Sequence, residues 1–300
     1  MKTGICWLYA IELYGYPPSM EDTGKALERI SKLGFKYTEI EAFGFEKKGN
    51  IKGFFRGRKE IKKIVDDLGL KIINLPMMLP GLVSLDSSRR KRAKELLNTA
   101  LEIAVYLESD MASFCSFTPD LEFIGERPYD TAISYGYEFR VKVDPNFSWN
   151  EQWSVLIDSF SWCNEKLKKA GIQMLIEPRV GEIVSNTDGI LRLIDGIRDS
   201  NFGAILEVAH LHGQREILPL SVEKLGERIR YVHVADNDGR DNNHNIPGDG
   251  TVDWEQLLLA LKKHNFSGYF LIDVRSRSKE KMDKDYVESK EFLEKLEARL

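Results

Sequence analysis

Short apolar runs alternate with longer segments of helical periodicity along the chain, and this alternation constrains the fold more than any other feature. The runs predicted as strands are residues 4–9, 35–44, 70–78, 110–117, 172–178, 202–208, 230–236 and 268–273. Each precedes a segment whose apolar residues recur every three or four positions. This repeat is typical of βα units that build a parallel sheet.

The segments predicted as helices are residues 20–34, 59–69, 88–107, 150–170, 186–200, 221–229, 252–266 and 285–300. Three of them stop at a glycine, namely Gly34, Gly69 and Gly171. Eight units predict a (β/α)₈ TIM barrel, for which about 250 residues are typical. An open doubly wound sheet is the alternative, but it would have to place eight parallel strands without closing. No Pro/Gly/Ser-rich linker divides the chain, so we expect a single domain over 1–300.

One region, 119–149, lacks the barrel periodicity. It lies between the fourth strand and its helix and is longer than ordinary βα connections. Its aromatic residues are Tyr129, Tyr135, Tyr137, Phe139, Phe147 and Trp149. We interpret 119–149 as an aromatic-rich insertion that forms either a flap over the site or the contact of a homo-oligomer.

Composition excludes several classes of partner. The net charge of −4 and the pI near 5.9 give no general attraction to nucleic acid or to an anionic membrane. Cys6, Cys115 and Cys163 are odd in number and widely spaced, which fits reduced, mostly structural thiols. No signal-peptide core or membrane-spanning apolar stretch is evident, so we expect a cytoplasmic protein.

Several predicted strands end in polar residues. These are Glu39 and Glu41, Asn74, Glu177, Glu207, His233 and Asp273. The carboxyl ends of barrel strands meet at one mouth, where barrel enzymes keep their active sites. Any one of these residues alone would suggest a core histidine or a solvent-facing acid. The last four units instead end in three carboxylates and one imidazole, those of Glu177, Glu207, Asp273 and His233. Together they predict a site for one divalent ion, Mn²⁺, Co²⁺, Mg²⁺ or Zn²⁺.

A family resemblance is carried by five blocks, namely "LIEPRVGEIVSNTDGILRLID", "GAILEVAHLHG", "YVHVADNDG", "HNIPGDGTVDW" and "GYFLID". Together they resemble the sugar phosphate isomerase/epimerase family, the xylose-isomerase-like TIM barrels, over residues 171 to 275. The resemblance implies that Glu177, Glu207, His233 and Asp273 bind one metal ion. It also implies that Glu177 and Asp273 act as the acid/base pair.

The chain departs from the family pattern at three points. Glu207 stands where Asp is common, Asp273 stands where Glu is common, and Pro178-Arg179 replaces the usual Asn-His. The first two changes place the ligands differently around an ion, and the third points to an unusual substrate or to reduced activity.

Further residues are assigned to substrate binding. His210 and His244 match family histidines that contact substrate or line the site. Arg179, Arg275 and Arg277 either hold a phosphate or carboxylate or neutralise an acid-rich rim. Within the "HNIPGDGTVDW" block, we expect Gly248 and Gly250 to shape the turn and Asp253 to cap the next helix.

The sequence therefore favours a metal-dependent isomerase or epimerase that acts on a sugar or sugar phosphate by proton transfer through an enediolate. A keto-inositol dehydratase is the nearest alternative. A barrel that binds a sugar or acid without converting it is a third. An abasic-site endonuclease of this architecture needs several histidines in the first half of the chain, but residues 1–209 contain none.

Overall fold

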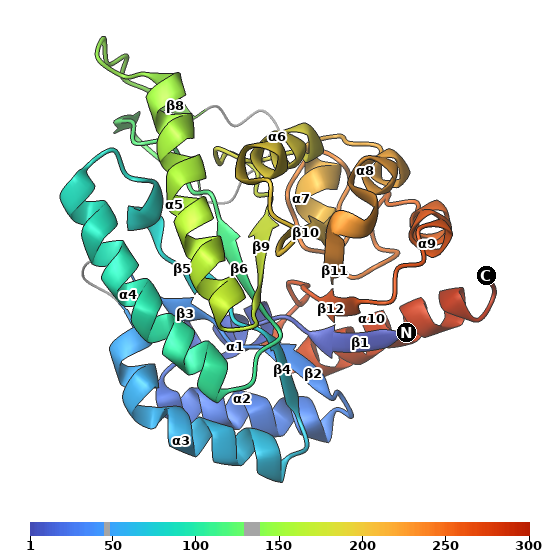
Figure 1. The fold of residues 1–300 in the computed structure, drawn as a ribbon. Helices are drawn as coiled ribbons and strands as arrows, with labels where there is room; N and C mark the ends of the chain where they lie inside the picture. The colour runs from blue at the N-terminus through green and yellow to red at the C-terminus, as the bar shows by residue number, and fades with distance from the viewer. Residues whose placement is uncertain (45–48, 129–138) are drawn as a thin grey trace.

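The computed structural model describes residues 1–44, 49–128 and 139–300. Eight parallel strands close into a barrel in sequence order, with β1 paired to both β2 and β12. They are β1 (Lys2–Ile5), β2 (Tyr37–Glu39), β4 (Lys71–Asn74), β6 (Met111–Cys115), β9 (Gln173–Glu177), β10 (Phe202–Glu207), β11 (Ile229–Val234) and β12 (Tyr269–Ile272). Helices surround the strands (Figure 1), so the predicted (β/α)₈ barrel is confirmed.

The eight predicted helices match the predicted segments to within four residues at each end, except that α3 begins at Ile51 rather than at 59. They are α2 (Met20–Lys32), α3 (Ile51–Asp67), α4 (Ser87–Tyr106), α5 (Trp149–Lys169), α6 (Thr187–Ile197), α8 (Leu218–Leu225), α9 (Trp254–Lys263) and α10 (Met282–Glu297). Side chains cap several N-termini, as where Ser19 accepts from Asp22 N at 3.1 Å. Gly34, Gly69 and Gly171 follow α2, α3 and α5 with positive φ, which glycine adopts without strain.

The first predicted strand, 4–9, was too long. β1 ends at Ile5, and the short helix α1 (Leu8–Tyr14) follows. The backbone N–H of Trp7 donates to Glu39 Oε1 at 3.2 Å rather than to a neighbouring strand, and this bond turns the chain out of the barrel. Cys6 is therefore the first residue beyond the strand and lies at the barrel mouth.

Three other boundaries differ from prediction. The runs 35–44 and 70–78 each form a barrel strand followed by a two-residue strand, β3 (Ala42–Phe43) and β5 (Met77–Met78), which pair with each other. The helix α7 (Val208–Gly213) follows β10 directly and was not predicted. Its N-terminus is set by Glu207, whose carboxylate accepts a hydrogen bond from His210 N.

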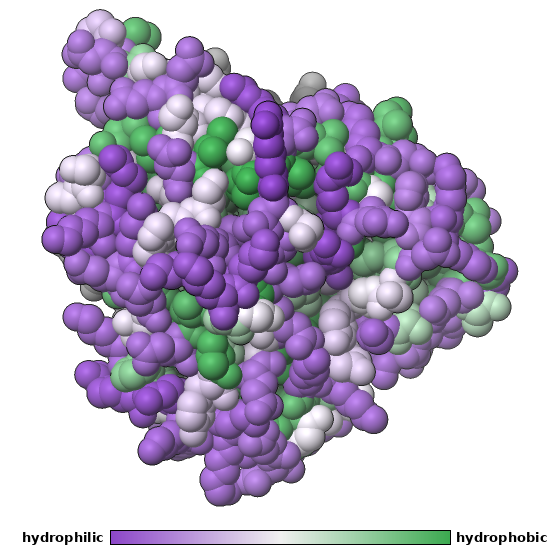
Figure 2. Space-filling view, viewed as in Figure 1, coloured by the Kyte–Doolittle hydropathy of each residue, from purple (hydrophilic) through white to green (hydrophobic). Residues whose placement is uncertain are grey.

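The hydrophobic core has two layers. An inner cluster fills the barrel and consists of Cys6, Ile73, Met111, Leu175, Ile205, Tyr231 and Leu271. A larger cluster lies between the strands and the helices. The face shown in Figure 2 is mostly hydrophilic, with small separate apolar areas. Among the helices that the structure describes, none is both long and apolar enough to cross a membrane.

The predicted aromatic insertion is described in part. β7 (Phe123–Ile124) and β8 (Arg140–Val141) pair antiparallel within it. Trp149 begins α5 and is exposed. Tyr129, Tyr135 and Tyr137 lie outside the described residues, so the flap and the homo-oligomer contact both stay predictions.

Candidate metal centre at the barrel mouth

The polar residues predicted from strand ends lie at one end of the barrel. Glu39, Asn74, Glu177 and Glu207 are the last residues of β2, β4, β9 and β10, and Asp273 directly follows β12. The strand register places Glu207 opposite His233 and Glu39 opposite Asn74. The side chains that the sequence singled out thus converge on the carboxyl ends of neighbouring strands.

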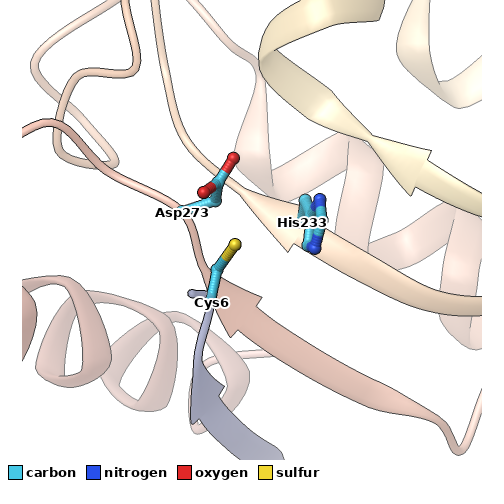
Figure 3. A group of neighbouring side chains, drawn as sticks. All are labelled: Cys6, His233 and Asp273. Atoms are coloured by element: carbon cyan, nitrogen blue, oxygen red, sulfur yellow. The ribbon is translucent and has the colours of Figure 1, made fainter. Parts of the chain in front are cut away.

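Two groups of potential metal ligands share Asp273. One consists of Cys6, His233 and Asp273, and the other consists of Glu207, His244 and Asp273. Within each group the candidate ligand atoms all lie within 4.8 Å of one another. Figure 3 shows the Cys6 sulfur directed to the space between Asp273 and His233. Three of the four predicted ligands therefore belong to these groups, namely Glu207, His233 and Asp273. Cys6 and His244 complete the groups.

Glu177, the fourth predicted ligand, belongs to neither group. Its Oε2 lies 3.7 Å from Cys115 Sγ, and its Oε1 lies 4.0 Å from Arg179 Nε. Its register partner is Cys115 on β6. The carboxylate faces the β6 side of the mouth, and its role as a ligand stays a prediction.

Unpartnered buried atoms test whether a cation fits these residues. Neither ring nitrogen of His233 has a hydrogen-bond partner in the described part of the chain, although its side chain is only 3% exposed. Glu207 Oε1 is likewise buried without a partner there. Leaving such an atom unsatisfied costs about 1–3 kcal/mol. Imidazole nitrogen, carboxylate oxygen and thiol sulfur are all donors for divalent ions, so the residues fit a metal.

Glu39 forms a buried anion beside His233. Its Oε1 accepts hydrogen bonds from Cys6 Sγ at 2.9 Å and Trp7 N at 3.2 Å. Its Oε2 accepts from Asn74 Nδ2 at 2.9 Å and Tyr231 Oη at 3.0 Å, and it lies 3.7 Å from His233 Nε2. Burial opposes ionisation, but the nearby His233 lowers the pKa of Glu39 below its ordinary value.

The pKa of His233 responds to the same contact. Burial alone would lower it, but the Glu39 carboxylate, 3.7 Å from His233 Nε2, raises the pKa of His233 to about 10. A carboxylate that holds a ligand histidine in place is a common partner of protein metal sites. Glu39 was noted at a strand end, but its contact with His233 joins residues far apart in sequence.

The second group contains a histidine and carboxylate pair. His244 Nδ1 lies 2.8 Å from the carbonyl oxygen of Asp273 and 3.0 Å from its Oδ2. Burial opposes both charges, but the charge of His244 lowers the pKa of Asp273, and Asp273 raises the pKa of His244 to about 9. Burial instead raises the pKa of Glu177, and it raises that of Glu207 to about 7. Of these three carboxylates, Asp273 is thus ionised, like Glu39, whereas Glu177 and Glu207 hold protons more readily.

His210 is buried near this pair. Its Nδ1 accepts from Val180 N at 3.3 Å, and its ring packs edge-on against His244 with the centroids 5.2 Å apart. Burial lowers the pKa of His210 well below its ordinary value. The structure therefore places this predicted substrate-binding residue as a neutral imidazole beside the second ligand group.

The arginines occupy different surroundings. Arg179 Nη1 lies 3.6 Å from Glu182 Oε1, and its side chain is mostly buried at the mouth. Arg275 is exposed, with its Nε 3.8 Å from Glu12 Oε1, and it lines a cavity of about 210 Å³ next to His244. Arg277 is held by the carboxylates of Asp249, Asp285 and Glu288. Arg179 therefore lies closest to the predicted acid/base carboxylate, and Arg277 links surface segments.

Asp236 organises the loop that carries His244. Its carboxylate accepts from the backbone nitrogens of Asn237 at 2.8 Å, Gly248 at 2.9 Å and Val252 at 3.1 Å. It also accepts from Trp254 Nε1 at 2.9 Å. A Cβ on Gly250 would lie 2.2 Å from Asp236 Oδ1, which explains the glycine there.

Other expectations for this loop are confirmed. Gly248 has a φ of +93°, and Asp253 caps α9 by accepting from Gln256 N at 3.1 Å. Asp236 was noted only as the last residue of the predicted strand 230–236, because most of its hydrogen-bond donors lie 12 to 18 residues further along the chain.

Two more residues at the mouth escaped sequence reasoning. Cys6 was grouped with structural thiols, although it directly follows an apolar strand. Glu182 is buried and accepts from Phe117 N at 2.7 Å. Burial raises the pKa of Glu182 to about 7. Glu182 follows the strand end by five residues, so strand position gave no signal for it.

The barrel and its mouth define the class of protein. The profile of the xylose isomerase-like TIM barrel family matches residues 27–296, and the chain belongs to this family. This confirms the resemblance seen in the sequence blocks.

Two solved structures with the same fold are sugar epimerases. The 3-keto-D-glucoside 4-epimerase from Escherichia coli has a TM-score of 0.74 and 17% identity, with 98% of this chain and 99% of that one covered. A D-psicose 3-epimerase from Clostridium cellulolyticum H10, solved with D-tagatose, has a TM-score of 0.76 and 15% identity, with 99% of both chains covered.

Curated relatives match a shorter part of the chain. Fructoselysine 3-epimerase of Escherichia coli O157:H7 is 23% identical over 128 residues, which cover 42% of this chain and 46% of the relative. Inosose dehydratase of Clostridium perfringens is 24% identical over 141 residues, which cover 41% of this chain and 47% of the relative. The chain spans about half the length of the curated relatives it matches.

Proposed function

We propose that the protein is a divalent-metal-dependent sugar isomerase or epimerase that acts by proton transfer through an enediolate. The family and the epimerase names of its relatives support a sugar substrate. The observation that carries the proposal is the set of buried, unpartnered ligand atoms of His233 and Glu207 around Asp273. Such atoms are stabilised when a cation binds them.

Glu177, Glu207, His233 and Asp273 would hold the ion, with Mn²⁺, Co²⁺, Mg²⁺ and Zn²⁺ as the candidates. When bound, the ion supplies positive charge that polarises two adjacent substrate oxygens and stabilises the enediolate. Every proton is moved by side chains of the chain itself.

Glu177 and Asp273 are the proposed acid/base pair. β9, which ends in Glu177, and β12, which precedes Asp273, are separated in the barrel by β10 and β11. The two carboxylates therefore approach a substrate in the mouth from different directions. We assign the ionised Asp273 to remove the proton from the carbon between the two substrate oxygens, and Glu177, whose raised pKa lets it hold a proton more readily, to return a proton to that carbon. His210 and Arg179 would orient the substrate.

Isotope exchange tests the proton-transfer step. With a panel of ketoses and aldoses in deuterated water, the product is expected to gain deuterium at the reacting carbon. Glu177→Gln is expected to abolish turnover while metal content, measured alongside, shows whether the ion is kept. Product formed without deuterium would count against free exchange with solvent, and so against the two-carboxylate transfer, and would favour a hydride shift or a shielded single-base transfer.

A dehydratase is the second candidate, because one relative is named an inosose dehydratase. It would remove a proton with the same carboxylates and then expel a hydroxyl group. The same assay with a keto-inositol, followed by mass spectrometry, separates the two functions, since only the dehydratase product loses one water molecule. Full metal occupancy without any product from these substrates would favour a binding protein.

The metal site has its own test. His233→Ala is expected to remove most of the roughly one bound ion per chain, because it deletes a ligand at the mouth. His264→Ala is the matched control, since His264 caps the end of α9 and contacts Glu223 instead. Metal analysis showing equal occupancy in both variants and in wild type would remove His233 from the ligand set.

A further inference from the structure

Cys6 lies at the metal centre, where the sequence suggested only a structural thiol. It is the first residue after β1, and β1 pairs with β12 on one side of the barrel. Its Sγ belongs to the ligand group with His233 and Asp273 (Figure 3). The backbone N–H of Cys6 donates to Ile272 O at 2.9 Å, which fixes the residue beside Asp273.

The neighbouring histidine gives independent support for a ligand at this position. His233 is buried, and both of its ring nitrogens lack a hydrogen-bond partner among the described residues. In the other group, by contrast, His244 Nδ1 already contacts the carbonyl oxygen and Oδ2 of Asp273. Both ring nitrogens of His233, beside Cys6, therefore have no hydrogen-bond partner among the described residues, whereas one ring nitrogen of His244 is already engaged.

We propose that Cys6 is a sulfur ligand of the metal ion, together with His233 and Asp273, and that the centre prefers Zn²⁺ or Co²⁺ to Mg²⁺ or Mn²⁺. A thiolate is a soft ligand that selects Zn²⁺ and similar ions, whereas carboxylate-only sites suit Mg²⁺ and Mn²⁺. The thiol now donates to Glu39 Oε1, and it must lose this proton when it binds the ion. The carboxylate of Glu39 is the adjacent acceptor for this proton.

This inference rests on the proposed metal dependence, and it concerns which atoms bind the ion. Enzyme activity does not report that. A thiolate bound to Co²⁺ absorbs strongly in the near ultraviolet by charge transfer, whereas nitrogen and oxygen ligands do not. The band therefore reports sulfur ligation directly, with or without turnover.

The experiment uses Co²⁺ titration of the metal-free full chain. Wild type is expected to show the charge-transfer band, and Cys6→Ser is expected to lose it. The double variant Cys115→Ser/Cys163→Ser leaves Cys6 as the single cysteine of the chain and is expected to keep the band. This variant keeps the test valid even if Cys6→Ser fails to fold.

Competition between ions gives a second readout. Cys6→Ser is expected to weaken Zn²⁺ binding at least about 10-fold and to change Mn²⁺ binding much less. A loss of affinity of about 10-fold is the smallest typical of replacing a residue that only supports a ligand. Equal weakening of both ions would overturn the sulfur ligand.

The outcomes separate the two proposals. Co²⁺ binding without the band, or a band that follows Cys115 or Cys163, would overturn the role of Cys6 and leave the metal-dependent function standing. Absence of any bound divalent ion would overturn both.

Discussion

Asp236 offers the sharpest test of how the loop beside the metal centre is stabilised. Its fully buried carboxylate accepts four hydrogen bonds, three from backbone nitrogens and one from Trp254. Asp236→Ala would leave these donors without an acceptor. Each unsatisfied buried donor costs about 1–3 kcal/mol, partly offset because a buried charge is removed and the loop relaxes. We expect a loss of about 3–5 kcal/mol in the free energy of unfolding.

Urea denaturation of the metal-free protein measures this loss as a lower midpoint at an unchanged slope. Asp238→Ala is the matched control in the same loop. Asp238 also accepts from two backbone nitrogens, those of Arg240 at 2.8 Å and Asp241 at 3.0 Å, but it is exposed, so water can replace it. We expect Asp238→Ala to cost less than about 1 kcal/mol. Similar midpoints for the two variants would refute the argument from burial.

Two further predictions concern the β9 side of the mouth. Because burial raises the pKa of Glu182 from 4.5 to about 7, the folded protein keeps a proton that the unfolded chain loses between these values, and this contribution to stability falls as the pH rises. Between about pH 5 and pH 7.5, the unfolding free energy of Glu182→Gln should therefore fall by about 2 kcal/mol less than that of wild type. Parallel profiles of unfolding free energy against pH for the two proteins would contradict this. Arg179→Ala should weaken binding of a sugar phosphate by about 2 kcal/mol and that of the neutral sugar much less, as measured by calorimetry. Arg275→Ala, at the exposed cavity, should have the smaller effect, and the reverse order would assign the anion to Arg275.

The barrel was predictable because its signals are local. Each strand is an apolar run and each helix has its own period and stop, so neither needs a distant contact to be recognised. The boundaries that were predicted wrongly depend on contacts across the barrel. β1 ends early because Trp7 N donates to Glu39, and α7 begins because the predicted ligand Glu207 also caps it. A single sequence does not reveal which distant carboxylate accepts a given N–H.

The residues of the candidate site divide in the same way, into those that local position in the sequence reveals and those that it does not. Glu207, His233 and Asp273 were found because they occupy equivalent strand ends, and the structure brings them together. Cys6 occupies such an end as well, but the overlong first strand placed it in a strand interior. Glu182 lies within a loop, where position relative to a strand carries no information. Asp236 ends the predicted strand 230–236, but its strand position does not reveal the distant backbone nitrogens that it binds. Their burial depends on how the loops fold back over the mouth.

The two departures from the family pattern have a common geometric consequence. Glu207 on β10 is one methylene longer than the usual Asp, and Asp273 after β12 is one methylene shorter than the usual Glu. An ion held by both is therefore expected to lie farther from β10 and closer to β12. β1 is the next strand beyond β12 in the closed barrel, and Cys6 stands at its end. The exchange of side-chain lengths thus moves the ion toward the sulfur atom that we propose as its ligand.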